Sequence, residues 1–248
     1  MVDRIRLEMT EGFTALHTSE ARYALLERLH SAALRHGAHV VAFGLNSREL
    51  RLVLHGDEVA VGQVTRGLRV GTTAAMRARG VTLRFGHTER VRCADVEAAV
   101  VWCHRAPEVD GVKGALGSPW TSHRDLLGFR SASFFDADVA RRYVDANRVH
   151  QRCGGRALPN KAESPREGAS VPLLLRLAAA VQGVLPADRR CFSLFTQLAR
   201  ACGYGTSEIA DALMLSKRRV RQLSNLDVDE HIQTALVALN DPRLCVVP

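Results

Sequence analysis

The chain has 248 residues, 46% hydrophobic and 24% charged, a composition that excludes a wholly disordered protein. No apolar run reaches the ~18 residues that span a bilayer, and the first residues lack the apolar stretch of a secretory signal, so we expect a cytoplasmic protein with no membrane partner. The formal net charge is +8, and all but three of the 34 basic residues are arginine. Arginine suits phosphate binding, although a GC-rich genome would also favour it.

The first half of the chain predicts interleaved strands and helices. Apolar and polar residues alternate at 4–9, 49–54 and 81–92, and residues 39–45 are rich in valine, which also indicates a strand. Helical spacing occurs at 20–36 (after a Ser19 cap), 57–79 and 94–105. The short turn between the second and third strands predicts a hairpin. This order favours an α+β fold, a ferredoxin-like antiparallel sheet with helices on one face.

The second half predicts helices alone. Residues 136–153 have helical spacing, 154–169 are rich in Gly, Pro and Ser, and helices follow from Val171. We therefore expect an α+β domain at 1–135, a helix and linker at 136–170, and an all-helical domain at 171–248.

The six cysteines predict neither a disulfide nor a zinc site. They form no CxxC pair, and no cysteine and histidine cluster has the spacing of a zinc motif. Most stand among apolar residues, which is typical of buried reduced thiols.

The strongest local motif is at 206–223, where two short helices are predicted around a brief turn. Thr206 or Ser207 would cap the first helix and Ser216 the second, with Ile209, Leu213, Val220 and Leu223 facing inward. This pattern indicates a helix-turn-helix, whose second helix enters the major groove. The alternative is an ordinary amphipathic pair with a solvated basic face. The predicted DNA-binding residues of the motif are Ser216, Lys217, Arg218, Arg219, Arg221 and Gln222.

Around this motif the tail resembles the DNA-binding domain of the replication initiator DnaA. The resemblance rests on residues 188–190 and 198–200 together with the two-helix motif, over about sixty residues. Met214 stands where such turns commonly have glycine.

Three segments of the first half resemble the REP-associated group of single-tyrosine HUH transposases. Residues 42–54 are similar to the family's strand-turn-strand, residues 104–111 to its Tyr-Ile-His-x-Asn-Pro-x-x-x-Gly segment, and residues 120–128 to its Trp-Ser-Ser-x-x-x-Tyr-x-Gly segment. The resemblance covers residues ~1–130 and implies an HUH transposase-type first domain. It also implies a homodimer.

The resemblance implies a catalytic site that this chain has lost. In the family, two histidines of the hairpin bind a divalent metal and a tyrosine attacks the scissile phosphate. Those positions hold Glu49, Arg51 and Trp102 here, and no tyrosine lies between residues 24 and 142. Arginine binds no metal and an indole offers no nucleophilic oxygen. We therefore expect no catalytic residue, metal or cofactor, and Arg51 becomes a candidate phosphate contact.

Other residues could be drawn into a site. Glu49, His55, Asp57 and His87 could form a metal set, but their spacing matches no ligand pattern. His104 keeps its family position, where we expect a capping or packing role rather than acid–base work. Cys103 could be a nucleophile, but the apolar face of its helix favours a core position.

Two functional hypotheses remain, and both bind DNA. The first is a domesticated, catalytically inactive transposase relative, a sequence-specific DNA-binding protein acting at the nucleoid as a transcription regulator or architectural factor. The second is an active single-strand DNA nuclease or transposase with a non-standard site. Double-stranded DNA is the expected partner, with hairpin or palindromic DNA as further candidates. An RNA-binding module is disfavoured, because the helix-turn-helix suits the wide major groove of B-form DNA.

Overall fold

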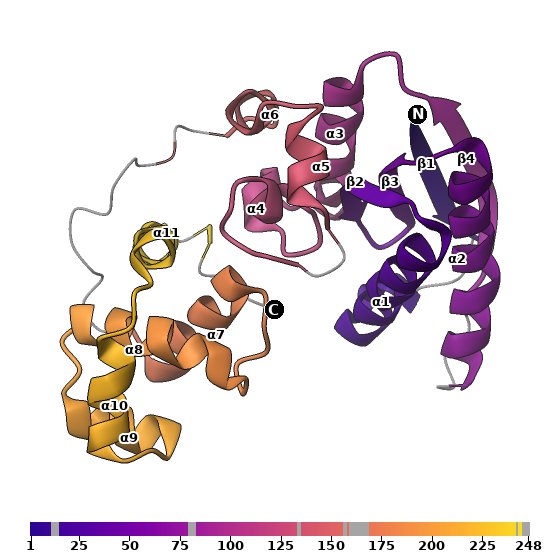
Figure 1. The fold of residues 1–248 in the computed structure, drawn as a ribbon. Helices are drawn as coiled ribbons and strands as arrows, with labels where there is room; N and C mark the ends of the chain where they lie inside the picture. Colours follow the sequence, from indigo (N-terminus) through magenta and orange to yellow (C-terminus); the bar gives the residue numbers. More distant parts are fainter. Residues whose placement is uncertain are drawn as a thin grey trace. The chain divides into compact units, whose positions relative to one another are not determined.

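The chain folds into two compact units in a computed structural model that describes residues 1–10, 15–78, 83–132, 135–155, 158, 169–241 and 243–244. Of these, residues 1–127 and 135–155 form the first unit, and residues 128–132 and those from 158 onward form the second. The segment 137–152, which the sequence assigns to a connecting region, packs within the first unit (Figure 1). No described helix is long and apolar enough to cross a membrane.

The first unit is built on a four-stranded antiparallel sheet with the order β2-β3-β1-β4. The strands are β1 (Val2–Met9), β2 (His39–Leu45), β3 (Glu49–His55) and β4 (Phe85–Arg92). Helix α1 (Ser19–His36) joins β1 to β2, and α2 (Glu58–Ala78) joins β3 to β4. The resulting βαββαβ connectivity is the ferredoxin-like one, so the α+β prediction is confirmed.

Helices cover both faces of this sheet, so the prediction of helices on one face is wrong. Helices α1 and α2 pack over Leu50, Leu52 and Leu54 of β3. On the other face lie α3 (Val96–His104), α5 (Ala137–Arg141) and α6 (Ala146–Arg152), packed over Val41 and Val53. The error arose because element order does not specify which face a helix after the last strand will cover.

A close approach fixes α3 on the second face. A Cβ added at Gly44 of β2 would lie 1.8 Å from the carbonyl oxygen of Cys103 near the end of α3, so only glycine fits there. The chain then passes through the 3-10 turns Ala106–Asp110 and Ala115–Gly117 to α4 (His123–Leu126). On the way it runs along β2, where Leu45 N donates to Trp120 O and Ser122 N to Phe43 O.

Several predicted boundaries need correction. The single helix expected at 136–153 is α5 and α6, because Asp136 and Asp145 each accept a backbone N–H and start a new helix. Thr18 rather than Ser19 caps α1, after a 3-10 turn at Ala15–His17. Strand β4 starts at Phe85, and residues 81–82 of the predicted strand lie outside the described residues, as does most of the predicted linker.

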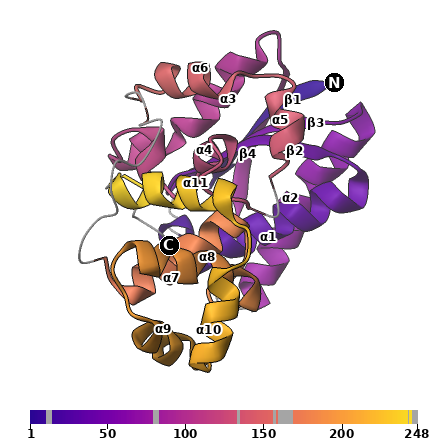
Figure 2. The same ribbon diagram turned by 60° about the vertical axis from the view of Figure 1, so that its left-hand side comes forward.

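The regular elements of the second unit are all helices within its described residues. It comprises α7 (Val171–Gln182), a 3-10 turn (Arg189–Cys191), α8 (Phe192–Ala201), α9 (Thr206–Leu213), α10 (Lys217–Ser224) and α11 (Asp229–Asn240). Helix α8 packs against α7, α9, α10 and α11 (Figure 2), and its Leu194, Phe195 and Leu198 are fully buried. These apolar side chains form the centre of the unit.

Replacing Gly44 by alanine tests the close approach. We expect Gly44→Ala to lower the free energy of unfolding by about 1–3 kcal/mol or more, because the new Cβ overlaps a backbone oxygen that cannot move alone. Gly71→Ala is the matched control: nothing lies within 4 Å of its added Cβ in the middle of α2, and helix propensity predicts a gain of roughly 0.5–1 kcal/mol. Chemical denaturation measures both. Equal stability of the two variants would contradict the steric argument.

Candidate functional site

Glu49 and Arg51, which stand at the hairpin positions where the family has its two histidines, belong to an ion-pair network on the second face of the sheet. Glu49, only 4% exposed, forms ion pairs with Arg6 of β1 and with Arg51 two residues along β3. The Arg51 Nη1 also donates to the carbonyl oxygen of Trp102 at 2.9 Å, and its guanidinium carbon lies 4.9 Å from the centre of the indole ring. Glu49, Arg51 and Trp102 are thus brought together, as the resemblance implies.

An asparagine turn holds Glu49 in place. The side-chain oxygen of Asn46 accepts hydrogen bonds from the backbone N–H groups of Arg48 and Glu49, which closes the turn between β2 and β3. Its amide nitrogen donates to Glu49 Oε1 and to the carbonyl oxygen of Ala106. The carboxylate of Glu49 is therefore fixed from three sides, by Asn46, Arg6 and Arg51.

The network decides the charge of Glu49. Burial acts to raise the pKa of this carboxyl, but the hydrogen bonds and charges of Arg6 and Arg51 outweigh burial, so the pKa lies below its ordinary value. Glu49 is therefore ionised, and its carboxylate is held by two guanidinium groups and the amide of Asn46. Arg51 offers no metal ligand, and Trp102 no nucleophilic oxygen.

The alternative metal set does not assemble. Glu49 and His55 stand at opposite ends of β3, which puts them about 20 Å apart. Asp57 accepts the backbone N–H of Ala60 at the start of α2, and His87 is exposed on β4. Cys103 is fully buried, and burial raises the pKa of its thiol well above the ordinary value, which fits the core position expected for it.

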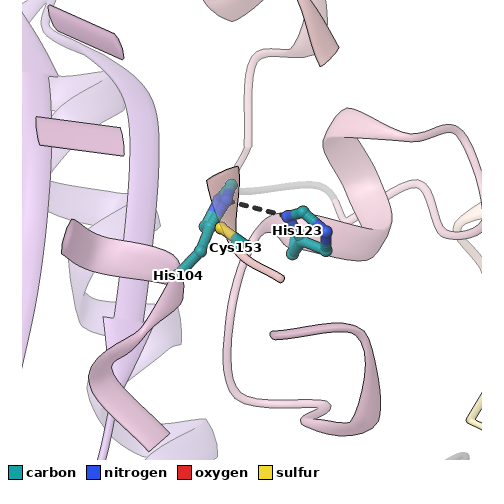
Figure 3. A group of neighbouring side chains, drawn as sticks. All are labelled: His104, His123 and Cys153. Carbon is teal, nitrogen blue, oxygen red and sulfur yellow. Dashed lines mark hydrogen bonds between the residues drawn. The ribbon is translucent and has the colours of Figure 1, made fainter. Parts of the chain in front are cut away.

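A cluster that the sequence did not predict lies beneath α3. His104, His123 and Cys153 each offer a potential ligand atom, and these atoms lie within 4.8 Å of one another (Figure 3). All three residues are buried, and His104 packs against Ser122 and His123 rather than facing solvent. Sequence spacing could not reveal the cluster, because its members lie far apart in the chain.

The predicted DNA-binding residues of the tail line the outer side of α10. Ser216 caps this helix as predicted, with its hydroxyl oxygen accepting the backbone N–H of Arg219. On α9 the expected cap is wrong: Gly205 occupies the cap position, and its N–H donates to Glu208. Val220 and Leu223 are buried. The exposed residues of the helix are Lys217, Arg218, Arg219, Arg221 and Gln222.

Met214 ends α9 in the left-handed conformation. Its φ of 52° is the only positive φ of a non-glycine residue in the described chain, and its side chain is 91% exposed. Methionine thus adopts the conformation that glycine commonly supplies at the end of a helix, and it allows the chain to turn within two residues before Ser216 begins α10.

A groove rich in arginine lies between α2 and β4 of the first unit. Its volume is about 880 Å³, and its basic lining residues are Arg66, Arg69, Arg77, Arg84 and Arg90. Arg90 is paired with Asp3, whereas the structure gives the other four no ion pair within the part of the chain it describes. No sequence motif marks this groove, although Arg66, Arg69 and Arg77 stand at helical spacing on α2.

Comparisons with known proteins give one weak likeness. No family model and no curated protein matches the chain. A solved structure of a REP-associated tyrosine transposase bound to a REP hairpin is similar over 58% of this chain and 82% of that chain, with 14% identity and a TM-score of 0.38. A likeness at this level does not establish the family.

Removing the charge of Glu49 tests the ion-pair network. We expect Glu49→Gln to lower the free energy of unfolding at neutral pH by about 1–3 kcal/mol, a value reduced for the partial exposure of Arg6. The pKa of Glu49 in the folded protein lies below its ordinary value. The carboxylate therefore contributes to the free energy of unfolding at any pH above the ordinary pKa, and this contribution is lost as the pH falls through the folded pKa. The difference in stability between the two proteins should therefore begin to shrink as the pH falls below about 4, and it should vanish once the pH has passed through the lowered folded pKa.

The matched control is Glu108→Gln, which breaks an exposed pair with Arg105. It should change stability by about 0.5 kcal/mol or less. Denaturant titrations across the acid range measure all three proteins. A Glu49→Gln deficit that stays constant down to pH 3 would show that the carboxylate charge is not what stabilises the fold.

Proposed function

We propose that the chain is a sequence-specific DNA-binding protein, a transposase relative without catalysis, that acts as a transcription regulator or architectural factor. The observation that carries the proposal is the outer side of α10. Five of the first six residues of this helix, all except Val220, are exposed and have cationic or amide side chains. Arginine, lysine and glutamine are the side chains that hydrogen-bond base edges and phosphates.

The packing of α9 and α10 supports a reading role for α10. Their inward residues Ile209, Leu213, Val220 and Leu223 are buried, so the pair is held against α8 while its outer side stays free. Lys217 and Arg218 stand in the first turn of α10, the part of a recognition helix that meets the bases. Arg219 is directed along the helix instead, since its Nη1 donates to Gln222 Oε1 at 3.1 Å.

The arginine groove supports a second, non-specific contact. Arg66, Arg69 and Arg77 follow one face of α2 over about 16 Å, and phosphate contacts of this kind position a protein without reading sequence. Two weak sites on one chain raise the overall affinity through effective concentration. The net charge of the chain suits this arrangement.

The occupied hairpin site supports the absence of catalysis. Glu49 is neutralised by Arg6 and Arg51, and the position of the family nucleophile holds Trp102, whose indole packs against Arg51. A covalent phosphoryl intermediate needs a nucleophilic oxygen or thiolate. Cys103 is a buried thiol with a raised pKa, which makes it a poor substitute.

Substitutions on α10 test the reading role. We expect Arg218→Ala to cost about 1–3 kcal/mol of binding free energy on the preferred duplex and to relax sequence preference at one position. Arg176→Ala on α7 is the matched control, because it removes one exposed charge from the same unit. Selection of sites from a random duplex library, followed by titration of the selected site, measures both quantities.

Substitutions in the groove have a different signature. Arg66→Gln with Arg69→Gln should weaken binding to all duplexes alike and reduce the slope of log K against log salt by about 0.9 for each phosphate that the variant no longer neutralises. If the groove variant lost sequence preference while Arg218→Ala kept it, the assignment of reading to α10 would be wrong.

A cleavage assay tests the absence of catalysis. The full chain, incubated with labelled single-strand hairpin DNA and magnesium or manganese, should give neither cleaved product nor a covalent adduct on a denaturing gel. An adduct would favour the alternative, an active nuclease or transposase with a non-standard site, and mass spectrometry of the adduct would then identify its nucleophile.

A further inference from the structure

Three helix ends converge at the cluster beneath α3. His104 is the last residue of α3, His123 is the first residue of α4, and Cys153 directly follows α6. His104 and His123 are completely buried and Cys153 is 6% exposed. One ligand atom of each lies within 4.8 Å of the other two, and Figure 3 shows both rings and the sulfur turned toward one another.

The rings are oriented by partners on their far sides. His104 Nε2 lies 2.9 Å from Ser122 Oγ, which itself accepts the backbone N–H of Phe43. His123 Nε2 lies 2.9 Å from Nδ1 of His150. With the far nitrogens held in this way, the two Nδ1 atoms face each other at 2.9 Å. A hydrogen-bonded far nitrogen is the arrangement that orients metal-binding histidines.

The protonation states suit metal binding. Burial lowers the pKa of His104 to about 3 and that of His123 well below its ordinary value, so both rings are neutral at physiological pH. Neutral imidazole is the form that donates an electron pair to a metal. Burial also raises the pKa of the Cys153 thiol to about 12, and a bound metal would have to displace this proton.

We propose that His104, His123 and Cys153 bind a zinc ion. Two nitrogens and one sulfur are the donors that zinc prefers, whereas magnesium and calcium take oxygen ligands. Nitrogens on one tetrahedral zinc lie about 3.3–3.4 Å apart, so the two Nδ1 atoms need to separate by a few tenths of an ångström. Three protein ligands leave the fourth position to a water.

Zinc would shift protons along the histidine chain. Without metal, one proton lies between the two Nδ1 atoms, so that His123 Nδ1 donates a hydrogen bond to His104 Nδ1. His150 Nδ1 in turn donates to His123 Nε2. With metal, both Nδ1 atoms donate electron pairs to zinc and the proton of His123 moves to its Nε2. The proton of His150 moves from Nδ1 to its own Nε2, so that His123 Nε2 can donate to His150 Nδ1. The thiol proton of Cys153 leaves to solvent as the thiolate binds.

The site would tie α3, α4 and α6 together on the second face of the sheet. It is separate from the Glu49 network and does not depend on DNA binding by the chain. It also departs from the expectation of no zinc site, because that expectation was based on sequence spacing alone.

Cobalt titration tests the proposal. The full chain, reduced and stripped with a chelator, is titrated with Co²⁺ while the absorption of the thiolate-to-cobalt charge-transfer band and the tetrahedral ligand-field bands is recorded. We expect one Co²⁺ per chain, a charge-transfer band, displacement of cobalt by Zn²⁺, and a higher melting temperature with zinc. An absent charge-transfer band in the unmodified chain would overturn the proposal without any variant.

Variants locate the metal. Cys153→Ser should abolish the charge-transfer band, and His123→Gln should weaken binding at least about tenfold. Cys191→Ser is the matched control, because Cys191 is a fully buried thiol of the second unit, and it should leave the band intact. A band that survives Cys153→Ser and disappears in Cys191→Ser would overturn the proposal by placing the metal elsewhere.

If either His123→Gln or Cys153→Ser fails to fold, ¹⁵N spectra of the histidine side chains in the unmodified chain supply the decision. Zinc should change the His123 tautomer from a protonated Nδ1 to a protonated Nε2. An unchanged tautomer at saturating zinc would show that the cluster is only a hydrogen-bonded chain of neutral histidines.

Discussion

The contact between Gly44 and the end of α3 is the constraint on which the second face of the sheet depends. Without a side chain at Gly44, the carbonyl oxygen of Cys103 comes down onto β2 at a distance that any Cβ would forbid. The residues on either side of Cys103 are then placed in two different environments. Trp102 lies over Arg51, and His104 turns into the interior toward Ser122 and His123.

The same contact explains why a charged network can exist inside this fold. Removing the carboxylate of Glu49 and the guanidinium group of Arg51 from water costs several kcal/mol per ion, and mutual attraction offsets the cost only where the remaining hydrogen bonds are satisfied. Arg6 costs less, because its side chain stays partly exposed. Here α3, which approaches β2 closely at Gly44, places the carbonyl oxygen of Trp102 where it accepts a hydrogen bond from Arg51. The turn after α3 places the carbonyl oxygen of Ala106 where it accepts a hydrogen bond from Asn46. The Glu49 network and the position of α3 therefore depend on each other, and a change in either would expose unpaired polar groups of the other.

Local patterns allowed the strands and most helices to be predicted, and long-range contacts explain the failures. Strand β2 was predicted residue for residue, because its valines and the following Asn46 turn are local signals. The break between α5 and α6 is also local, since Asp145 caps a helix start, but the apolar spacing across it masked the signal. The histidine and cysteine cluster had no local signal, because its members come from three helix ends that only the tertiary fold brings together.

Each unit contains one position where the backbone is sterically constrained, Gly44 in the first and Met214 in the second. The two positions differ in whether the charged side chains near them are buried or exposed. In the first unit, Gly44 removes a side chain, and the polar groups that gather there are buried and paired. In the second unit, Met214 accepts a left-handed conformation that costs roughly 1 kcal/mol or more. The benefit is a turn short enough to hold Leu213 and Val220 in one core while α10 changes direction. The charges of α10 are consequently left outside, on a helix whose orientation is fixed by its buried side. A packed inner side and an exposed outer face are together what the proposed reading role of α10 requires, since flexibility of the inner side would add an entropic cost to every contact that the outer side chains make.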